Sequence, residues 1–296
     1  MGSVDTWVGY WGRLRPDRAA VAANARVVTW KSLAERGGRL AAGLAAEGAL
    51  RGSRIGVRSR DPLGVIEVIA ACARLGTVAV PLDPDSDQDR LRGIVASAEL
   101  FALLSEADEI GLDKGRAEIE TETEMDGALL LLSGDGPEGA VLTHGNVEAV
   151  AAAMIAADGL VPPDCVGITL PSMTTPIALA ATLGALHAGA LIRFGDIAGL
   201  LGDADRPQPT VLVTSCEELE RPGVPERVAA ARPRLVKVPG PVPGALRREC
   251  QSRGIPFVEM SGLSLQQSPY LESDELVPLL GLEGWDGGLT ILGRRG

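Results

Sequence analysis

Hydrophobic positions in the first third of the chain follow two spacings in turn. Residues 32–47 carry Leu33, Leu40 and Leu44 at helical spacing, and the short apolar run 54–57 that follows has the length of a strand. Residues 62–75 predict a second helix that opens at a proline, and residues 77–80 predict a second strand. Residues 87–98 and 100–104 repeat this rhythm.

The same alternation continues to about residue 260. Asn146 is the expected cap of a helix over 147–158. Further helices are expected over 176–187, 224–231 and 243–253, with strands over 166–170, 190–194, 210–214, 236–238 and 256–259. Strands that alternate with helices of about a dozen residues predict an α/β fold, with largely parallel sheets flanked by helices.

A Pro-Pro-Asp step at residues 162–164 is the best candidate boundary between two stacked subdomains, each expected to hold one sheet. The expected division is an N-terminal α/β subdomain over residues 1–161, a second α/β subdomain over 162–283 and a tail over 284–296.

The most informative segment is the apolar strand 129–132 with the glycine-rich loop and helix that follow it. Such a loop presents backbone N–H groups to an anion, and phosphate-binding loops normally add hydroxyls and a lysine. Here the loop contains Asp135 and Glu138 and no lysine. Two carboxylates beside a triphosphate would repel it by about a few kcal/mol in a partly desolvated site. An ordinary strand-to-helix turn is the simpler alternative when the loop is taken by itself.

Five segments, in order along nearly the whole chain, resemble the motifs of one family. Residues 27–33 resemble a "Thr-Tyr-x-x-Leu" helix entry, and residues 73–84 resemble "Lys-Ala-Gly-Ala-x-x-Val-Pro-Leu-Asp-Pro". Residues 130–146 resemble the signature "Tyr-Thr-Ser-Gly-Thr-Thr-Gly-x-Pro-Lys-Gly-Val-x-x-Thr-His-x-Asn". Residues 234–243 resemble a glycine-rich turn at the adenylate pocket, and residues 260–266 resemble "Tyr-Gly-Leu-Thr-Glu". The chain thus resembles the AMP-forming adenylating enzymes, which include acyl- and aryl-CoA ligases, luciferases and peptide-synthetase adenylation domains.

The resemblance also shows which of the family's ATP-binding residues this chain lacks. The signature loop is shorter and has lost its threonines and lysine; it keeps Ser133, Gly134, Gly136 and Gly139, with Asp135 among them, and ends in Thr143, His144 and Asn146. In the fifth motif the magnesium-binding glutamate is replaced by Leu265. A leucine cannot bind a hard cation that requires oxygen ligands.

The last residues resemble the hinge that leads to the family's mobile C-terminal domain. Residues 269–284 are too few for the family's small barrel, and the "Thr-Gly-Asp" motif that holds the ribose is missing. We therefore expect a truncated, degenerate large domain without the barrel or the C-terminal domain. These changes count against ATP and magnesium as cofactors and against AMP-forming ligase activity.

Candidate substrate-binding residues follow the strands of the second subdomain, because ligands of open α/β sheets bind beyond the carboxyl ends of the strands. They are Thr174, Thr175, Cys216, Gly240, Ser261, Gly262 and Ser264. The resemblance implies an acyl or aryl group in that region, presented free or as a thioester of CoA or phosphopantetheine.

Catalytic residues are less clear from the sequence. His144 together with Ser133 and Asp135 supplies a base and a nucleophile, but His144 is equally explained as a helix-entry residue. Cys216 lies near a helix start, which would lower its pKa, and beside two glutamates, which would raise it. A half-buried structural cysteine is the alternative for this position.

Composition limits the partners and the compartment. The 296 residues have a formal charge of −11, which argues against nucleic acid and anionic membranes as partners. Neither a secretion signal nor a membrane span is visible, so a cytoplasmic protein is expected. The four cysteines are scattered and the two histidines lie far apart, so neither a disulfide framework nor a metal site is predicted.

Three functions remain open. The chain is either a repurposed enzyme that transfers, cyclises or hydrolyses an activated acyl or aryl thioester without ATP, or a non-catalytic partner of an intact ligase or a carrier protein. The third is a ligase large domain completed by a separate C-terminal domain, against which Leu265 and the missing lysine count.

Overall fold

The structure, a computed structural model, describes residues 2–105, 127–132, 139–170, 172–202, 205–260 and 289–292. Its first half contains α1 (Val4–Leu14), β1 (Ala19–Ala23), β2 (Arg26–Thr29), α2 (Trp30–Ala46), β3 (Arg54–Arg58), α3 (Pro62–Leu75), β4 (Val78–Leu82), α4 (Gln88–Ser97), β5 (Leu100–Ser105), β6 (Gly127–Leu132), β7 (Gly139–Thr143) and α5 (His144–Asp158). The second half contains β8 (Cys165–Ile168), α6 (Pro176–Ala188), β9 (Leu191–Phe194), α7 (Ile197–Leu201), β10 (Val211–Val213), α8 (Cys216–Leu219), α9 (Val224–Ala231), β11 (Leu235–Pro239), α10 (Gly244–Ser252), β12 (Phe257–Met260) and β13 (Leu289–Leu292).

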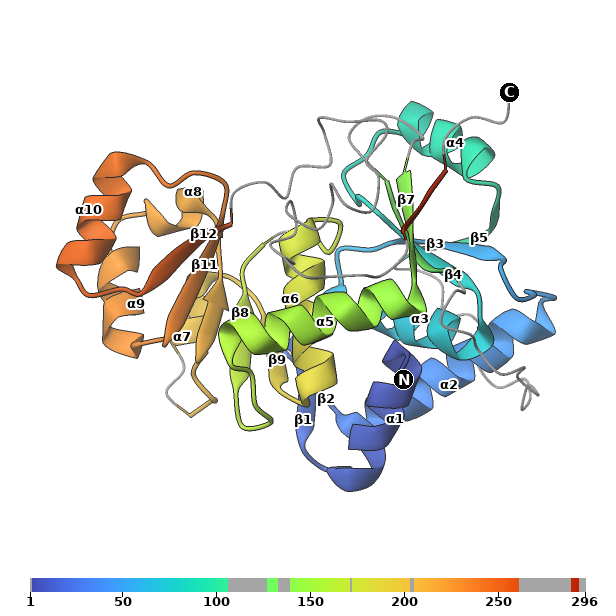
Figure 1. The fold of residues 1–296 in the computed structure, drawn as a ribbon, viewed down its shortest axis with the longest axis horizontal. Coiled ribbons are helices and arrows are strands. Elements are labelled where there is room, and N and C mark those ends of the chain that lie inside the picture. The colour runs from blue at the N-terminus through green and yellow to red at the C-terminus, as the bar shows by residue number, and fades with distance from the viewer. Residues whose placement is uncertain are drawn as a thin grey trace.

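The strands form two sheets (Figure 1). The seven-stranded sheet has the order β12-β11-β10-β8-β9-β1-β2, and every neighbouring pair is parallel except β1 with β2. The six-stranded sheet has the order β13-β7-β6-β4-β3-β5, in which β7 pairs antiparallel with both β6 and β13. The expected α/β class with largely parallel sheets is confirmed.

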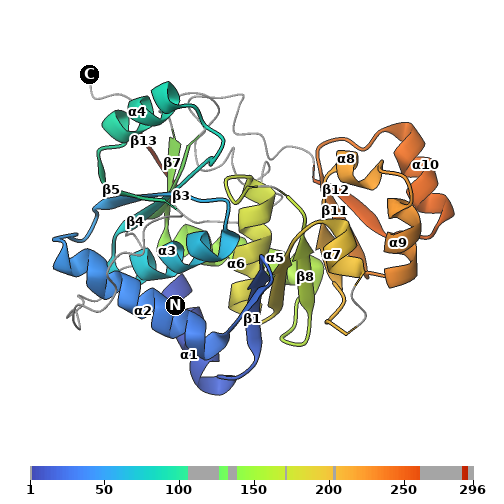
Figure 2. The ribbon, with the colours of Figure 1, turned by 180° about the vertical axis from the view of Figure 1, so that it is seen from behind.

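Helices fill the space between the sheets and cover their outer faces. One large apolar core joins α1, α2, α3, α5 and α6 to the inner faces of both sheets. A second core packs α7 to α10 on the outer face of the seven-stranded sheet, and a third packs α4 on the outer face of the six-stranded sheet. Figure 2, seen from behind, shows the helices α3 and α6 between the two sheets. The result is an α-β-α-β-α stack of five layers.

Successive side chains of a strand point to opposite faces of its sheet, so one strand contributes to two of these cores. On β10, Val211 and Val213 belong to the inner core, whereas Leu212 belongs to the outer one. On β11, Val236 and Val238 face the outer core. The period of two therefore directs Lys237, a charged residue, toward the inner helix layer.

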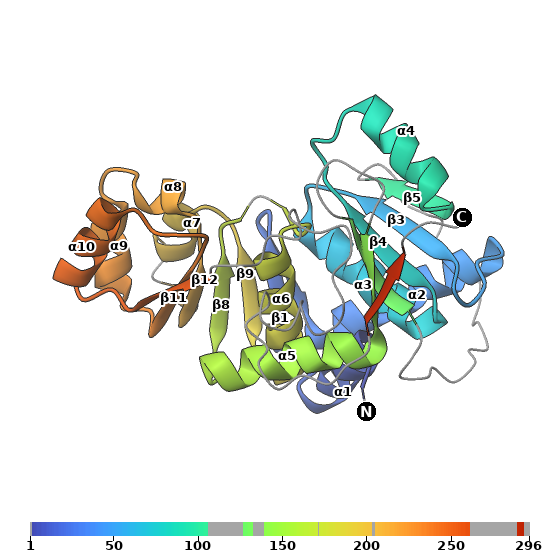
Figure 3. The ribbon, with the colours of Figure 1, turned by 45° about the horizontal axis from the view of Figure 1, so that its top comes forward.

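Helix α5 links the two sheets. It begins directly after β7 of the six-stranded sheet and extends toward β8 of the other, as Figures 1 and 3 show. Its N-cap is Thr143, whose side chain accepts a hydrogen bond from the backbone N–H of Asn146, while the Asn146 side chain accepts one from the Thr143 N–H. The expected cap at Asn146 is therefore corrected. Thr143 is the N-cap, Asn146 is the N3 residue of the capping box, and the helix starts at His144, three residues before the predicted start at 147.

The sheets do not follow the predicted division of one sheet for each segment. The hairpin of β1 and β2 belongs to the seven-stranded sheet, because Val21 and Ala22 pair with Ile192 and Arg193 of β9. That part of the prediction is wrong, since the first thirty residues contribute to the sheet assigned to residues 162–283. Helix α1, the hairpin and β7 were also absent from the predicted elements.

Among the described residues no helix is both long enough and apolar enough to cross a membrane.

Candidate functional site

The carboxyl ends of β8, β10, β11 and β12 form one edge, because these neighbouring strands are parallel. Hydrogen bonds tie the residues that follow the strands to one another. The Thr169 hydroxyl donates to the Thr214 hydroxyl at 2.8 Å, and the Gly240 N–H donates to the Met260 carbonyl at 3.1 Å. We call this row, Thr169, Thr214, Gly240 and Met260, the carboxyl edge. It is the place where the sequence analysis expected a ligand.

Gly240 lies at this edge with a φ of 77°, in the left-handed region that glycine adopts at little cost. In the described part of the chain, nothing lies within 4 Å of the position that a Cβ would take there. The turn after β11 therefore has space beside its half-buried backbone at the edge, as the resemblance to a pocket wall implies.

Thr174 and Thr175 lie in the loop between β8 and α6. The Thr174 hydroxyl is 2.7 Å from the Ser172 hydroxyl, which also accepts from the Thr174 N–H at 3.1 Å. Thr175 is the N-cap residue of α6 without a side-chain capping bond. The structure thus places both threonines at the end of the loop between β8 and α6, with Thr174 held by Ser172.

Cys216 starts the short helix α8 after β10, and its Sγ lies 3.8 Å from the Pro241 carbonyl oxygen. Burial raises the pKa of its thiol, and the carboxylates of Glu220 and Glu259 raise it further. The acidic surroundings therefore outweigh the helix start, and Cys216 is a neutral thiol near pH 7.

His144 is the first residue of α5 and is buried. Burial, followed by the positive charge of Arg51, lowers the pKa of His144 to about 4, so its imidazole is neutral near pH 7. The other end of α5 contacts β11 through Asp158, and a helix of this length extends roughly 21 Å. Since Cys216 follows β10, the strand beside β11, His144 and Cys216 lie too far apart to form a nucleophile–base pair.

Several predicted site residues lie outside the described residues. They are Ser133, Gly134, Asp135 and Gly136 of the loop, with Ser261, Gly262 and Ser264 after β12. Gly139 is the first residue of β7, whose backbone is described. The grouping of His144 with Ser133 and Asp135 therefore stays a prediction.

A buried ion pair, which the sequence analysis did not find, joins the inner helix layer to β11. The Nζ of Lys237 lies 2.5 Å from Oδ1 of Asp158, and both side chains are 3% exposed. Arg234 donates to the Asp158 carbonyl and, at 2.7 Å, to Oδ2 of Asp164. The sequence gives one sign of this pair: Lys237 is a basic residue in an otherwise apolar strand, and Asp158 is the last residue of a helix.

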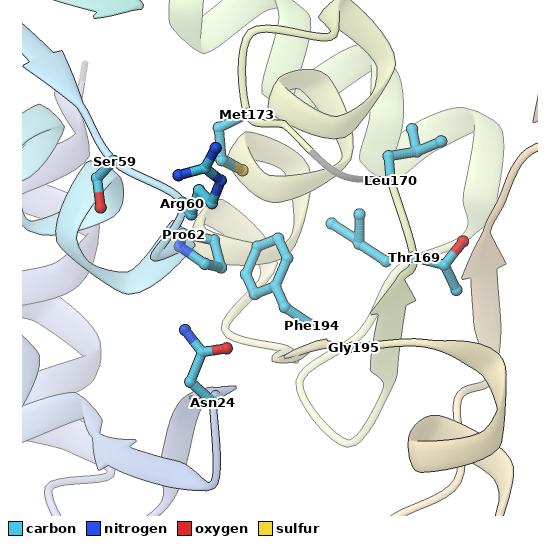
Figure 4. A pocket seen from close by; sticks show the side chains of 10 residues that line it. Asn24, Ser59, Arg60, Pro62, Thr169, Leu170, Met173, Phe194 and Gly195 are labelled. Carbon is cyan, nitrogen blue, oxygen red and sulfur yellow. The ribbon is translucent and has the colours of Figure 1, made fainter. Parts of the chain in front are cut away.

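A cavity, also absent from the sequence analysis, lies on the other side of β8 from most of the carboxyl edge. Its volume is about 190 Å³, and its walls come from the turn after β1, the loop after β3 and the ends of β8 and β9. Figure 4 shows side chains from these four segments facing one space. Among the described residues, no group of three His, Cys, Asp or Glu side chains could hold a metal ion.

Comparisons with known proteins agree with this arrangement. Residues 10–144 match the sequence model of the family described as AMP-binding enzyme. The 2-succinylbenzoate–CoA ligase of Bacillus cereus (strain Q1) is 26% identical over 322 residues, covering 96% of this chain and 64% of the ligase. The feruloyl-CoA synthase of an Amycolatopsis species is 27% identical over 298 residues, covering 88% of this chain and 59% of the synthase. The chain thus spans about three fifths of the length of these curated relatives.

Solved structures share the fold. The o-succinylbenzoate coenzyme A synthetase of Bacillus subtilis in complex with AMP superposes with a TM-score of 0.76 at 21% identity, covering 89% of this chain and 61% of the synthetase. The N-terminal subdomain of Klebsiella oxytoca NpsA with 3-hydroxyanthranilyl-AMSN superposes with a TM-score of 0.75 at 19% identity, covering 89% and 74%. The fold is that of the adenylate-forming ligases. Residues 10–144 thus match an AMP-binding domain, and the similar proteins are named as acyl-CoA ligases and a peptide synthetase.

Proposed function

We propose that this chain binds an acyl or aryl group at the carboxyl edge and does not hold ATP for adenylation. The observation that carries the proposal is the charge of the phosphate loop. The family signature reads Pro-Lys-Gly where this chain reads Pro137-Glu138-Gly139, and Asp135 stands where the signature has a threonine. A cation and a hydroxyl that would attract phosphate are thus replaced by two anions.

Two family residues that this chain keeps at the start of α5 do not supply the missing charge. The Thr143 hydroxyl is engaged in the capping box of α5, and His144 carries no charge near pH 7 because its pKa is about 4. Leu265 removes the carboxylate that the family motif offers to magnesium. The residues present do not fit a magnesium-bound nucleotide, so no reaction step is assigned to ATP.

The acyl or aryl part of the proposal is supported by the retained carboxyl edge and by the relatives. The 2-succinylbenzoate–CoA ligase and the feruloyl-CoA synthase are both named for an aromatic acid joined to CoA. In this chain the edge offers the half-buried backbone at Gly240 and the hydroxyl of Thr169, which is held by the buried Thr214. A thioester of CoA or of a carrier protein is the substrate class that needs no activation by ATP.

One observation favours binding over catalysis. The two described catalytic candidates, His144 and Cys216, lie far apart, and the pKa of Cys216 is raised by burial and by neighbouring acids. The two therefore do not form with each other the hydrogen-bonded nucleophile and base that acyl transfer requires. A non-catalytic partner of an intact ligase or carrier protein is therefore the second candidate function.

Thermal unfolding with separate ligands distinguishes these functions. A ligand at about 100 times its dissociation constant stabilises by roughly 2.7 kcal/mol if it binds only the folded state. We expect stabilisation by aryl acids or aryl-CoA thioesters and none by ATP with magnesium. Release of free CoA from a stabilising thioester, followed with a thiol reagent, indicates a transferase or hydrolase, and binding without release indicates the partner function. Stabilisation by ATP with magnesium, together with acid-dependent pyrophosphate exchange, would refute the proposal.

A further inference from the structure

The 190 Å³ cavity is assembled by segments far apart in the sequence. Asn24 comes from the turn between β1 and β2, and Ser59 and Arg60 come from the loop between β3 and α3. Met173 follows β8 and Phe194 ends β9. Strands of both sheets thus direct their carboxyl ends toward this space, which is where α/β sheets bind ligands.

One wall of the cavity is polar and is fixed by hydrogen bonds. The Asn24 amide donates to Oδ1 of Asp61 at 3.3 Å, and the Ser59 hydroxyl accepts from the Asp61 N–H at 2.9 Å. Asp61 is also the N-cap of α3. Because it bonds to both Asn24 and Ser59, Asp61 fixes the hairpin turn and the loop after β3 relative to each other. The polar wall is therefore built before any ligand arrives, which lowers the entropic cost of binding.

Arg60 supplies the positive charge of this wall. It forms an ion pair with Asp85, and the two side chains are 65% and 69% exposed. Exposed pairs of this kind contribute little to stability, on the order of 0–1 kcal/mol. A guanidinium has five N–H donors, so a ligand carboxylate can share Arg60 with Asp85 or replace it.

The opposite wall is apolar. Figure 4 shows Met173, Phe194 and Leu170 around the space, with Pro62 beside the Phe194 ring. The volume is below the roughly 300 Å³ at which drug-sized sites begin, so the cavity suits a ligand of about the size of benzoate. A short apolar body with one anionic end matches the two walls.

We propose that this cavity is a second binding site, beside the carboxyl edge, for a small monocarboxylate with an aromatic or branched apolar body, whose carboxylate is held by Arg60 and whose body packs against Met173 and Phe194. In the sheet, β8 lies between β9 and β10. The cavity opens on the β9 side, whereas Cys216, Gly240 and Met260 follow strands on the β10 side. The cavity therefore adjoins the carboxyl edge at β8, where both include Thr169, and differs from it in its other residues.

Methionine methyl groups provide one probe for each site. Met173 lines the cavity, and Met260 ends β12 at the carboxyl edge. In the whole chain labelled with ¹³C-methyl methionine, titration with benzoate should shift the Met173 resonance saturably and leave Met260 unchanged. A shift of Met260 without Met173, or no shift of Met173 at millimolar benzoate, would overturn the proposal. The proposed function is tested separately, by whether aryl acids or aryl-CoA thioesters shift the Met260 resonance.

Two substitutions should move the affinity in opposite directions. Arg60→Leu should weaken benzoate binding roughly tenfold or more, as expected when a charge-assisted hydrogen bond is lost. Asp85→Asn should strengthen it, because it removes the carboxylate that competes for Arg60. Benzamide, a neutral ligand of the same shape, should bind weakly and equally to all three proteins. Unchanged benzoate affinity in Arg60→Leu, with the Met173 resonance of the free protein unmoved, would contradict the assigned role of Arg60.

Discussion

Removing either partner of the buried Lys237–Asp158 pair should destabilise the fold strongly, by about 3–5 kcal/mol. The two charges lie 2.5 Å apart with both side chains 3% exposed, between α5 and β11. Lys237→Met leaves the Asp158 carboxylate without its partner in the inner helix layer, and Asp158→Asn leaves the Lys237 ammonium alone. Water cannot readily replace the missing partner at this exposure, which is the reason for the large cost.

The double substitution Lys237→Met with Asp158→Leu should restore most of the stability. Replacing both ions by apolar groups removes their desolvation cost together with their attraction, and such replacements are often neutral or stabilising. Lys237 already lies 3.6 Å from the Met154 sulfur, so a methionine at position 237 meets an apolar neighbour. The control is Arg92→Met, which breaks an ion pair with side chains 76% and 90% exposed and should change stability by less than about 0.5 kcal/mol.

The two single variants should also respond to pH with opposite signs. Burial raises the pKa of Asp158, and Lys237 lowers it; without Lys237 this pKa rises further. The folded Lys237→Met protein then binds more protons than the unfolded chain, so its stability increases as the pH falls toward the ordinary aspartate range. Burial lowers the pKa of Lys237, so Asp158→Asn regains stability as the pH rises toward the lysine range.

Urea unfolding followed by circular dichroism at about pH 5.5, 7 and 8.5 measures these differences, and each variant can gain at most about 1.4 kcal/mol per pH unit. The account is refuted if either single substitution costs less than about 1 kcal/mol. It is also refuted if the double variant loses the sum of the two single losses, because that result would mean that the two charges do not interact.

Three further results are expected. Thr143→Ala should cost about 1 kcal/mol in thermal or urea unfolding while Thr143→Ser should cost less, because only serine keeps the capping bond to Asn146; equal losses would contradict the capping box. His144 should show no NMR titration between about pH 5.5 and 8, since its pKa is about 4, and a midpoint at the ordinary histidine value of about 6.5 would contradict its burial. Iodoacetamide should modify Cys216 before the three buried cysteines, yet more slowly than a free thiol at neutral pH, because burial and nearby acids raise its pKa; faster labelling of Cys72, whose pKa burial raises to about 12, would contradict the core packing.

The alternating elements could be predicted because each carries its own local signal. Residues 62–75 open with a proline after an aspartate and end before a glycine, and α3 has those bounds, with Asp61 as its cap and Gly76 in the left-handed region. The hairpin was missed because β1 reads Ala-Ala-Val-Ala-Ala, which has only one β-branched residue and no aromatic residue, the types that are enriched in strands. Its place in the sheet depends on β9, far away in the sequence, and no local pattern reports such a pairing.

The predicted site residues likewise have local sequence signals, whereas the missed ones depend on contacts between distant segments. Gly240 directly follows β11, and Thr174 and Cys216 lie in the segments after β8 and β10, so the sequence could predict their side of the parallel sheet. The cavity and the Lys237–Asp158 pair are made by segments that meet only in three dimensions. Lys237 lies in an otherwise apolar strand, but its buried partner is set by where the last turn of α5 packs.

The most direct test of the central claim is equilibrium binding of ATP with magnesium to the chain and to a variant with a restored loop. The variant carries Asp135→Thr and Glu138→Lys, which return the hydroxyl and the cation of the family signature. We predict no saturable binding to the unmodified chain up to about 1 mM ATP and measurable binding to the variant. Binding of ATP with magnesium to the unmodified chain that is unchanged or weakened in the variant would contradict the claim that the phosphate loop has lost its function.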